Sequence, residues 1–192
     1  MSKSATAVRK FKAYILMIRL EIFDENSYTD LISWVESEEQ LMQFAGPVFT
    51  YPLTKEQIEN SISDKNRFAF KVVNCETNTT IGHSEIYLTD QSACLGRILI
   101  GNKELRGKGL GQQIVNLLLD IVFSKLDKSK AELNVFDWNI EAIKCYEKVG
   151  FTINPNKKID RQINSKSWTA INMTIDILKW QNLLLSKHTN DQ

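Results

Sequence analysis

Short segments with alternating apolar and polar residues recur along the 192-residue chain, and this period of two predicts β-strands. The polar run from Glu76 to Thr79 separates two of these segments and has the composition of a hairpin turn. A second polar turn is expected around Asn164 and Ser165. The predicted strands cover residues 18–23, 67–74, 80–89, 93–101, 130–136, 151–159 and 168–177.

Other segments carry apolar residues three or four positions apart, which predicts amphipathic helices. Thr54 followed by Gln57 predicts a capping box at the start of one helix, and Gly150 predicts the end of another. A first helix is expected from Asp24 or Asn26 to about Val35. The other predicted helices cover residues 38–44, 55–63, 109–126, 139–149 and 178–185.

The order of these elements predicts an α/β (α+β) fold with a mainly antiparallel sheet. A strand–helix–strand crossover over residues 93–136 predicts one parallel pair of strands within it. We expect a single domain over residues 17–185, a flexible leader over 1–16 and a flexible tail over 186–192. The leader is basic, so a targeting or membrane-contact segment is the alternative interpretation.

Composition excludes several classes of function. The net charge of +1 gives no basic field for nucleic acid. Three scattered cysteines without close spacing are typical of reduced thiols, which favours a cytoplasmic protein without disulfides or a zinc site. The two histidines lack metal-ligand spacing, so no metal is expected. No segment is long and apolar enough to predict a membrane span.

The run from Arg106 to Gly111, with glycine at 107, 109 and 111, is the strongest chemical signal. It joins a predicted strand to a predicted helix. Glycines accept positive φ angles that turn successive N–H groups the same way, and a helix N-terminus favours anions. The loop therefore predicts a phosphate site, with charge from Arg106 and Lys108. The ATP-type motif GxxxxGK[ST] is absent.

A second motif follows about thirty residues later and includes Leu133, Val135, Asn139, Ala142, Tyr146, Gly150 and Phe151. Together the two motifs closely resemble the signature segments of the GNAT superfamily of acetyl-CoA-dependent N-acetyltransferases. The resemblance covers residues 18–177 and is most specific over 99–151. The N-terminal part, with Trp34 and the run from Phe44 to Pro47, looks most like the RimJ/RimL-like branch.

The resemblance implies a mixed, twisted, mostly antiparallel sheet flanked by helices, whose central parallel strands, 93–101 and 130–136, splay apart. Acetyl-CoA would enter the gap between them. Its pantetheine arm would bind the backbone of Leu99, Ile100 and Gly101. Its pyrophosphate would lie on the loop, and the implied cofactor-binding residues there are Arg106, Gly107, Lys108, Gly109, Leu110 and Gly111.

The implied reaction is direct attack of a neutral primary amine on the thioester in a ternary complex. Tyr146 matches the family position that protonates the departing thiolate, and a phenol stays protonated at neutral pH. Packing on its helix is the alternative role for Tyr146. Asn139 is expected to cap its helix and, by resemblance, to contact the cofactor arm.

The general base is not marked by a motif. The strand leading into the glycine loop carries no carboxylate over residues 94–100. Alternation places His83 and Glu85 on one face of the preceding strand, so Glu85, with His83, is the predicted catalytic base acting through water. A polar edge without catalytic function is the alternative, and Asp137 is a further candidate.

The acceptor is expected to be a small-molecule amine or a peptide N-terminus, bound between the N-terminal helices and the last hairpin. Aromatic residues in those segments are expected to form either the pocket wall or the core; they are Trp34, Phe44, Phe49, Tyr51 and Trp168. A non-catalytic acyl-CoA-binding or sensing module is the main alternative function, and an unrelated phosphate-binding domain is another. A homodimer is possible.

Overall fold

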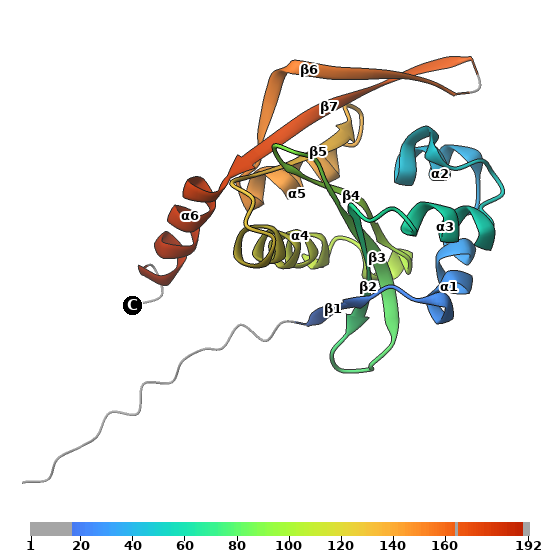
Figure 1. Cartoon of the computed structure of the whole chain (residues 1–192), viewed down its shortest axis with the longest axis horizontal. Helices are drawn as coiled ribbons and strands as arrows, with labels where there is room; N and C mark the ends of the chain where they lie inside the picture. Colours follow the sequence, from blue (N-terminus) through green and yellow to red (C-terminus); the bar gives the residue numbers. More distant parts are fainter. Residues whose placement is uncertain (1–16, 164, 190–192) are drawn as a thin grey trace, which may run out of the picture.

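One mixed β-sheet forms the centre of the computed structural model, which describes residues 17–163 and 165–189 (Figure 1). Within these residues seven strands lie in the order β1-β2-β3-β4-β5-β7-β6, and every neighbouring pair is antiparallel except β4 with β5. The strands are β1 (Ile18–Ile22), β2 (Arg67–Asn74), β3 (Thr80–Leu88), β4 (Ala93–Ile100), β5 (Lys130–Phe136), β6 (Thr152–Ile163) and β7 (Lys166–Asp176). The predicted fold class is confirmed.

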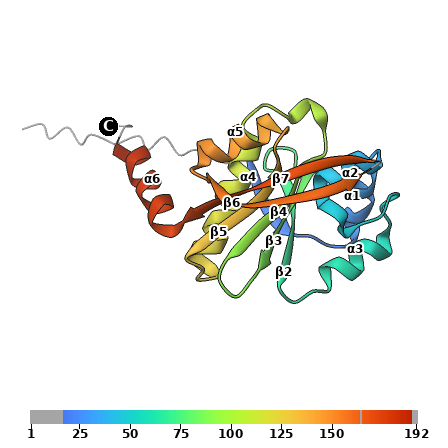
Figure 2. The same cartoon turned by 90° about the horizontal axis from the view of Figure 1, so that it is seen from above.

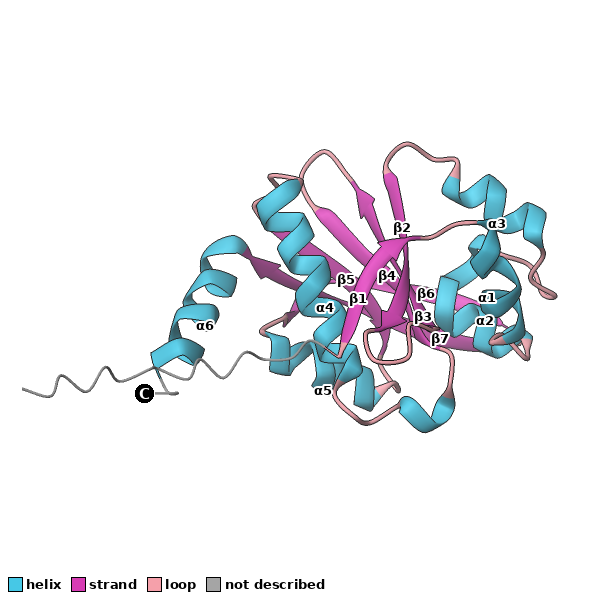
Figure 3. Cartoon of the chain, turned by 90° about the horizontal axis from the view of Figure 1, so that it is seen from below, coloured by secondary structure: helices cyan, strands magenta, loops and turns pink. Residues whose placement is uncertain are grey.

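Helices cover both faces of this sheet in two groups (Figure 3). One group, α1 to α3, comes from the N-terminal third of the chain, and α4 and α5 follow the crossover strands. The helices are α1 (Tyr28–Ser33), α2 (Glu38–Ala45), α3 (Lys55–Ile62), α4 (Leu110–Asp120), α5 (Ile140–Val149) and α6 (Ile177–Thr189). No helix in the described part of the chain is long and apolar enough to cross a membrane.

Two apolar clusters hold the layers together. The larger packs α4, through Ile114 and Leu118, against strand residues such as Val72 and Leu133. The smaller joins α1 to α3 through Leu31, Leu41 and Ile58, and contacts Leu99 of β4. The sheet therefore has one apolar face under α4 and a second face that the N-terminal helices α1 to α3 cover.

The predicted alternation in β3 is confirmed by its register with β2. Glu85 pairs with Ala69 and His83 with Lys71, so both side chains belong to the face that α1 to α3 cover. Ser84 pairs with Phe70, which belongs to the cluster under α4. Polar side chains are thus placed beneath the N-terminal helices.

Strand β4 contains a β-bulge that decides the shape of the sheet. Glu85 of β3 pairs with Gly96 of β4, but His83 pairs with Leu99, so β4 has one extra residue between these pairs. Arg97 within the bulge has a φ of 49°, the left-handed conformation that side chains other than glycine rarely adopt. Pairing of β4 with β5 is confined to the three residues from Ala93 to Leu95. The bulge therefore begins where the parallel strands part.

Some predicted element boundaries were wrong. The first helix is split, because Asp24 caps a short 3-10 turn, Glu25–Ser27, that precedes α1. The helix expected to reach residue 126 leaves α geometry at Ile121, where a π turn begins. The last hairpin is longer than predicted because its polar residues pair across the strands, as Asp160 does with Thr169 through a 2.7 Å hydrogen bond.

The last helix is longer than predicted. Helix α6 continues to Thr189, so helical backbone covers residues 186–189 of the predicted tail. The predicted leader, residues 1–16, lies outside the described residues.

Thr54 caps α3 as predicted, but the side chain of Gln57 bonds the backbone of Thr50 and Pro52 instead of closing the capping box.

Gly101, at the end of β4, lies directly under the indole ring of Trp34. A Cβ atom at position 101 would clash with Cε2 of Trp34, so we expect Gly101→Ala to destabilise the fold by about 1–3 kcal/mol through overpacking. Gly96→Ala in the same strand is the control, because no atom lies within 4 Å of its added Cβ. Urea unfolding of both variants measures the difference, and equal stabilities would contradict this packing.

Candidate active site

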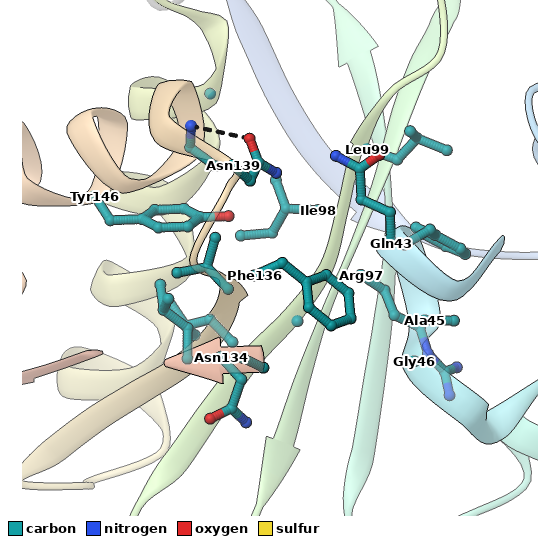
Figure 4. A pocket seen from close by; sticks show the side chains of 18 of the residues that line it. Gln43, Ala45, Gly46, Arg97, Ile98, Leu99, Asn134, Phe136, Asn139 and Tyr146 are labelled. Carbon is teal, nitrogen blue, oxygen red and sulfur yellow. Dashed lines mark hydrogen bonds between the residues drawn. The ribbon is translucent and has the colours of Figure 1, made fainter. Parts of the chain in front are cut away.

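A single cavity of about 1010 Å³ extends from the glycine loop, along the gap between β4 and β5, to α2 and β6. Figure 4 shows that Tyr146 and Asn139 approach this gap from one side of β4, whereas Gln43, Ala45 and Gly46 lie on the other side. The cavity is thus continuous from the predicted phosphate loop to the region expected to hold the acceptor.

Most of the predicted site residues line this cavity. They are Glu85, Leu99, Ile100, Arg106, Gly107, Gly109, Gly111, Asn139 and Tyr146. Gly101, Lys108 and Leu110 do not line it. Leu110 is buried in the core, and Gly101 has the packing role described above. The sequence motifs therefore converge on one cavity, and two of their residues, Gly101 and Leu110, serve the fold.

The glycine loop has the backbone conformation that its sequence predicts. Gly107 and Gly109 have φ angles of 74° and 81°, and a Cβ atom on either would meet nothing within 4 Å, so their requirement is conformational. Gly109 is the N-cap of α4, which places the N-terminus of an eleven-residue helix at the cavity. Gly111 differs, since its added Cβ would lie 3.2 Å from Sγ of Cys145 on α5.

The backbone of β4 turns Ile100 toward the gap. The N–H of Gly101 donates to the carbonyl of Ile81 at 2.9 Å, so it is used within the sheet. Because alternate residues of an antiparallel strand bond the same neighbour, the N–H and carbonyl of Ile100 face away from β3. Arg106 donates from Nε and Nη2 to that carbonyl, at 3.0 and 2.9 Å. Arg106 thus contacts the strand as well as the loop.

Two side chains of the α5 segment complete this end of the cavity. Asn139 caps α5, its side-chain oxygen accepting from the N–H of Ala142 at 3.4 Å, and Figure 4 shows its amide nitrogen turned toward β4. The hydroxyl of Tyr146 points into the gap toward Ile98 (Figure 4). Burial raises the pKa of the Tyr146 phenol, so the hydroxyl stays protonated at neutral pH.

Glu85 lies at the centre of a buried cluster of charged groups. Its Oε2 accepts from Arg67 at 2.6 Å, and its Oε1 lies 3.0 Å from both Arg97 and His83. Burial alone raises the pKa of this carboxyl, but the His83 hydrogen bond and the charges of Arg97 and Arg67 outweigh it and hold the pKa at about 2. Such a carboxylate is a weak proton acceptor near neutral pH.

The geometry gives Glu85 a structural task that the sequence does not reveal. Arg97, the bulge residue, bonds Glu85 and Ser61 through Nη1, at 3.0 and 2.8 Å, and its guanidinium lies over the ring of Phe49. These contacts fix the left-handed residue of β4. The base role of Glu85 stays a prediction, and this arrangement favours a positioning role instead.

The other candidates for the base occupy different places. His83 is buried behind Glu85, with its ring against Phe23 and Phe44. Asp137 is exposed and does not line the cavity. Among the predicted acceptor aromatics, Trp34 and Phe44 line the cavity; Phe49, Tyr51 and Trp168 do not.

Sequence reasoning missed several lining residues, among them Arg67, Arg97, Phe136 and Arg161. Gly96 inside a strand is a signal for the bulge, and an arginine in that otherwise apolar strand is a signal for a buried ion pair. The polar segment around Arg161 carries no such signal. Among the residues that the structure describes, no group of three or more potential metal ligands is placed to hold an ion.

Comparison with known families decides the assignment. Residues 18–152 match the model of the acetyltransferase (GNAT) domain. The chain belongs to the GNAT family. The matched segment includes β1 to β5, α4 and α5, and therefore both sides of the gap and the glycine loop.

Curated relatives of this GNAT domain match over a shorter segment. The type 1 aminoglycoside N(6')-acetyltransferase of Klebsiella pneumoniae is 38% identical over 53 residues, 28% of this chain and 26% of that protein. A kanamycin resistance protein of Rhizobium radiobacter is 36% identical over 52 residues, 27% of this chain and 48% of that protein. The matches therefore span less than half the length of these relatives.

Solved structures share the fold over almost their full length. The spermidine N-acetyltransferase of Vibrio cholerae, in complex with CoA and spermine, has a TM-score of 0.70 at 22% identity, covering 86% of this chain and 98% of that one. The aminoglycoside acetyltransferase AAC(6')-Ib, in complex with coenzyme A and kanamycin, has a TM-score of 0.67 at 20% identity and the same coverage. These likenesses establish the GNAT fold.

The Glu85 cluster predicts a pH-dependent stability. The folded pKa of about 2 lies below the ordinary value of 4.5, so the stabilisation by this carboxylate is complete above pH 4.5 and is lost as the pH falls toward 2. We expect Glu85→Gln to cost on the order of 3 kcal/mol at pH 7, because Arg97 loses its buried partner.

Denaturant unfolding from pH 7 to pH 3 measures this effect. The difference in unfolding free energy between wild type and Glu85→Gln should shrink below pH 4.5. Glu141→Gln is the matched control, since the Glu141 side chain is 91% exposed and should show no appreciable difference at any pH. A constant difference for Glu85→Gln would contradict the cluster's charge state.

Proposed function

We propose that this protein is an N-acetyltransferase that transfers the acetyl group of acetyl-CoA to a primary amine. The observation that carries the proposal is the gap itself: β4 parts from β5 after Leu95, next to a glycine loop that opens a helix. An unrelated fold with a phosphate loop would not need this splay. Membership in the GNAT family and the CoA bound to both structural neighbours support the same cosubstrate.

Successive parts of acetyl-CoA match successive stretches of the cavity, from the glycine loop to the gap between β4 and β5. The N–H groups of Gly107 to Gly111, at the N-terminus of α4, supply donors for the pyrophosphate. The outward N–H of Ile100 supplies a donor for an amide of the pantetheine arm, as a neighbouring strand would bond it. The side-chain amide of Asn139 faces the same gap and adds a second polar contact. Of the other residues predicted in this role, Leu99 pairs with His83 of β3 and the N–H of Gly101 donates to Ile81, so their backbones serve the sheet. Lys108 and Leu110 contribute only their loop N–H groups to the proposal.

The transfer requires one bond to form and one to break. The neutral amine nitrogen attacks the thioester carbonyl carbon, a C–N bond forms, and the C–S bond breaks with the electrons leaving on sulfur. Tyr146 donates its phenolic proton to that thiolate, and the proton lost by the amine returns the phenolate to phenol through water. Holding both reactants in one cavity supplies much of the rate.

Direct transfer is favoured over an acyl-enzyme because the cavity's cysteines are poor nucleophiles. Burial raises the pKa of Cys94 to about 11 and also raises the pKa of Cys145. Both therefore remain thiols at neutral pH. The acetyl group therefore passes directly to the amine in a ternary complex of the protein, acetyl-CoA and the amine.

Finer parts of the prediction remain proposals. We propose a RimJ/RimL-like member acting in the cytoplasm on a small amine, with a peptide N-terminus as the second acceptor and a homodimer as the assembly. The alternative, a non-catalytic CoA-binding module, would retain the loop but has no use for a phenol directed into the gap.

Thiol release from acetyl-CoA in the presence of varied amines tests the proposed function. We expect Tyr146→Phe to lower kcat by about 100-fold, because the thiolate leaves without a proton donor, while the dissociation constant for CoA stays within about twofold of wild type. Tyr51→Phe, outside the cavity, is the control. Unchanged kcat for Tyr146→Phe would assign this tyrosine to packing, and CoA binding without transfer to any amine would favour the non-catalytic module.

A further inference from the structure

The cavity has a second arm on the side of β4 that α2 covers, away from Tyr146. We name it the acceptor arm and define it by six lining residues: Gln43, Arg67, Glu85, Tyr87, Arg97 and Arg161. They come from α2, from the face of β2 to β4 beneath it, and from β6. Figure 1 shows the β6–β7 hairpin reaching across toward α2, and Figure 2 shows the same approach from above.

This arm carries more positive than negative charge. Arg67, Arg97 and Arg161 are cationic, and Glu85 is the arm's one carboxylate among the residues described. Both oxygens of Glu85 are already occupied, by Arg67 on one side and by Arg97 and His83 on the other. The single negative charge of Glu85 is therefore already compensated within the protein, and the three arginines leave two positive charges unbalanced.

Arg161 is the arginine of this set that is available to a ligand. It is half-buried on β6, and the described part of the chain shows no hydrogen bond or ion pair from its guanidinium. Nε of Arg67 is also buried without a hydrogen-bond partner among the described residues. The arm thus has more cationic donors than anionic acceptors, an imbalance that a carboxylate ligand relieves.

A polycation is poorly matched to such an arm. Spermine and kanamycin, the amines in the two structural neighbours, bring several positive charges. Here each added ammonium group would face uncompensated arginines across a partly desolvated cavity, where like charges repel strongly. An acceptor with one amine and one anionic group fits both the acceptor arm and the gap. Its anionic group binds the arginines of the arm, and its amine then faces the gap between β4 and β5.

We propose that the acceptor is a small amino carboxylate, such as an amino acid, whose carboxylate is bound by Arg161. The proposal rests on the proposed acetyl transfer and narrows its substrate class. Arginine suits this task because its planar fork makes two parallel hydrogen bonds to a carboxylate. Arg67 and Arg97, held by Glu85, contribute charge and shape the wall of the arm.

Thiol release with matched acceptors tests the substrate class. Each amino acid is compared with its carboxamide, and putrescine, spermidine and kanamycin complete the panel. For the preferred amino acid, wild type should show kcat/KM at least about tenfold higher than for the carboxamide or for any polyamine. A preference for the polyamines or for kanamycin, or equal use of acid and amide, would overturn the proposal.

Variants at position 161 test the residue. Arg161→Gln should raise KM for the amino acid about tenfold or more, leave KM for its carboxamide unchanged, and keep the wild-type melting temperature. Arg161→Lys should recover part of the loss. Lys158→Gln, an exposed residue of the same strand outside the cavity, is the matched control. Unaltered acid-to-amide discrimination in Arg161→Gln would overturn the assignment of this residue.

Failure of the two proposals is distinguishable. If no amine releases thiol, the proposed catalytic function fails. Calorimetry on CoA-saturated protein then judges the acceptor arm, since an amino acid should still bind more tightly than its carboxamide and lose this advantage in Arg161→Gln. Equal binding of acid and amide, or no binding of either, would overturn the further inference.

Discussion

The buried ion pair between Arg97 and Glu85 is the interaction on which the rest of this structure depends. A strand hydrogen-bonded along both edges has no room for a ligand, so a gap inside a sheet needs a local fault. Here the fault is the extra residue of β4, whose left-handed backbone at Arg97 costs roughly 1–3 kcal/mol. The side chain of that residue is bonded to Glu85 and Ser61, and these contacts offset the strain.

The consequences of this bulge extend to both substrates. Before it, β4 pairs with β5; after it, the outward backbone of Ile100 is available to a ligand and to Arg106. The two motifs then meet across the gap, the loop at the start of α4 and the Asn139–Tyr146 segment of α5. The charged cluster that stabilises the bulge is also the wall of the acceptor arm. One set of contacts therefore shapes the sheet and determines the charge that an acceptor meets.

Local signals in the sequence predict most of the fold. Period-two alternation locates the strands, and residues such as Thr54, Asn139 and Gly150 act at the helix ends as their chemistry requires. The glycine loop is predicted for the same reason: positive φ at Gly107 and Gly109 is a local property. Gly101 is an exception. This position excludes a side chain because the ring of Trp34, a residue far away in sequence, packs against it.

The charge state of the site depends on contacts between residues far apart in the chain, so local sequence signals do not predict it. Alternation places Glu85 on the correct face, but only the fold brings Arg67 and Arg97 to its two oxygens and removes it from solvent. The same carboxylate would be a plausible base if it were alone. Arg161 reaches the cavity because the last hairpin extends beyond its predicted length, which cross-strand pairs such as Asp160 with Thr169 make possible.

Amide hydrogen exchange with and without CoA tests the central claim most directly. If the bulge opens a cofactor gap beside the glycine loop, CoA should slow exchange at the amides of residues 107–111 and at Ile100, and leave the amides of β1 and β2 unchanged. Binding of CoA without protection at these positions, or with protection confined to another part of the sheet, would contradict the account.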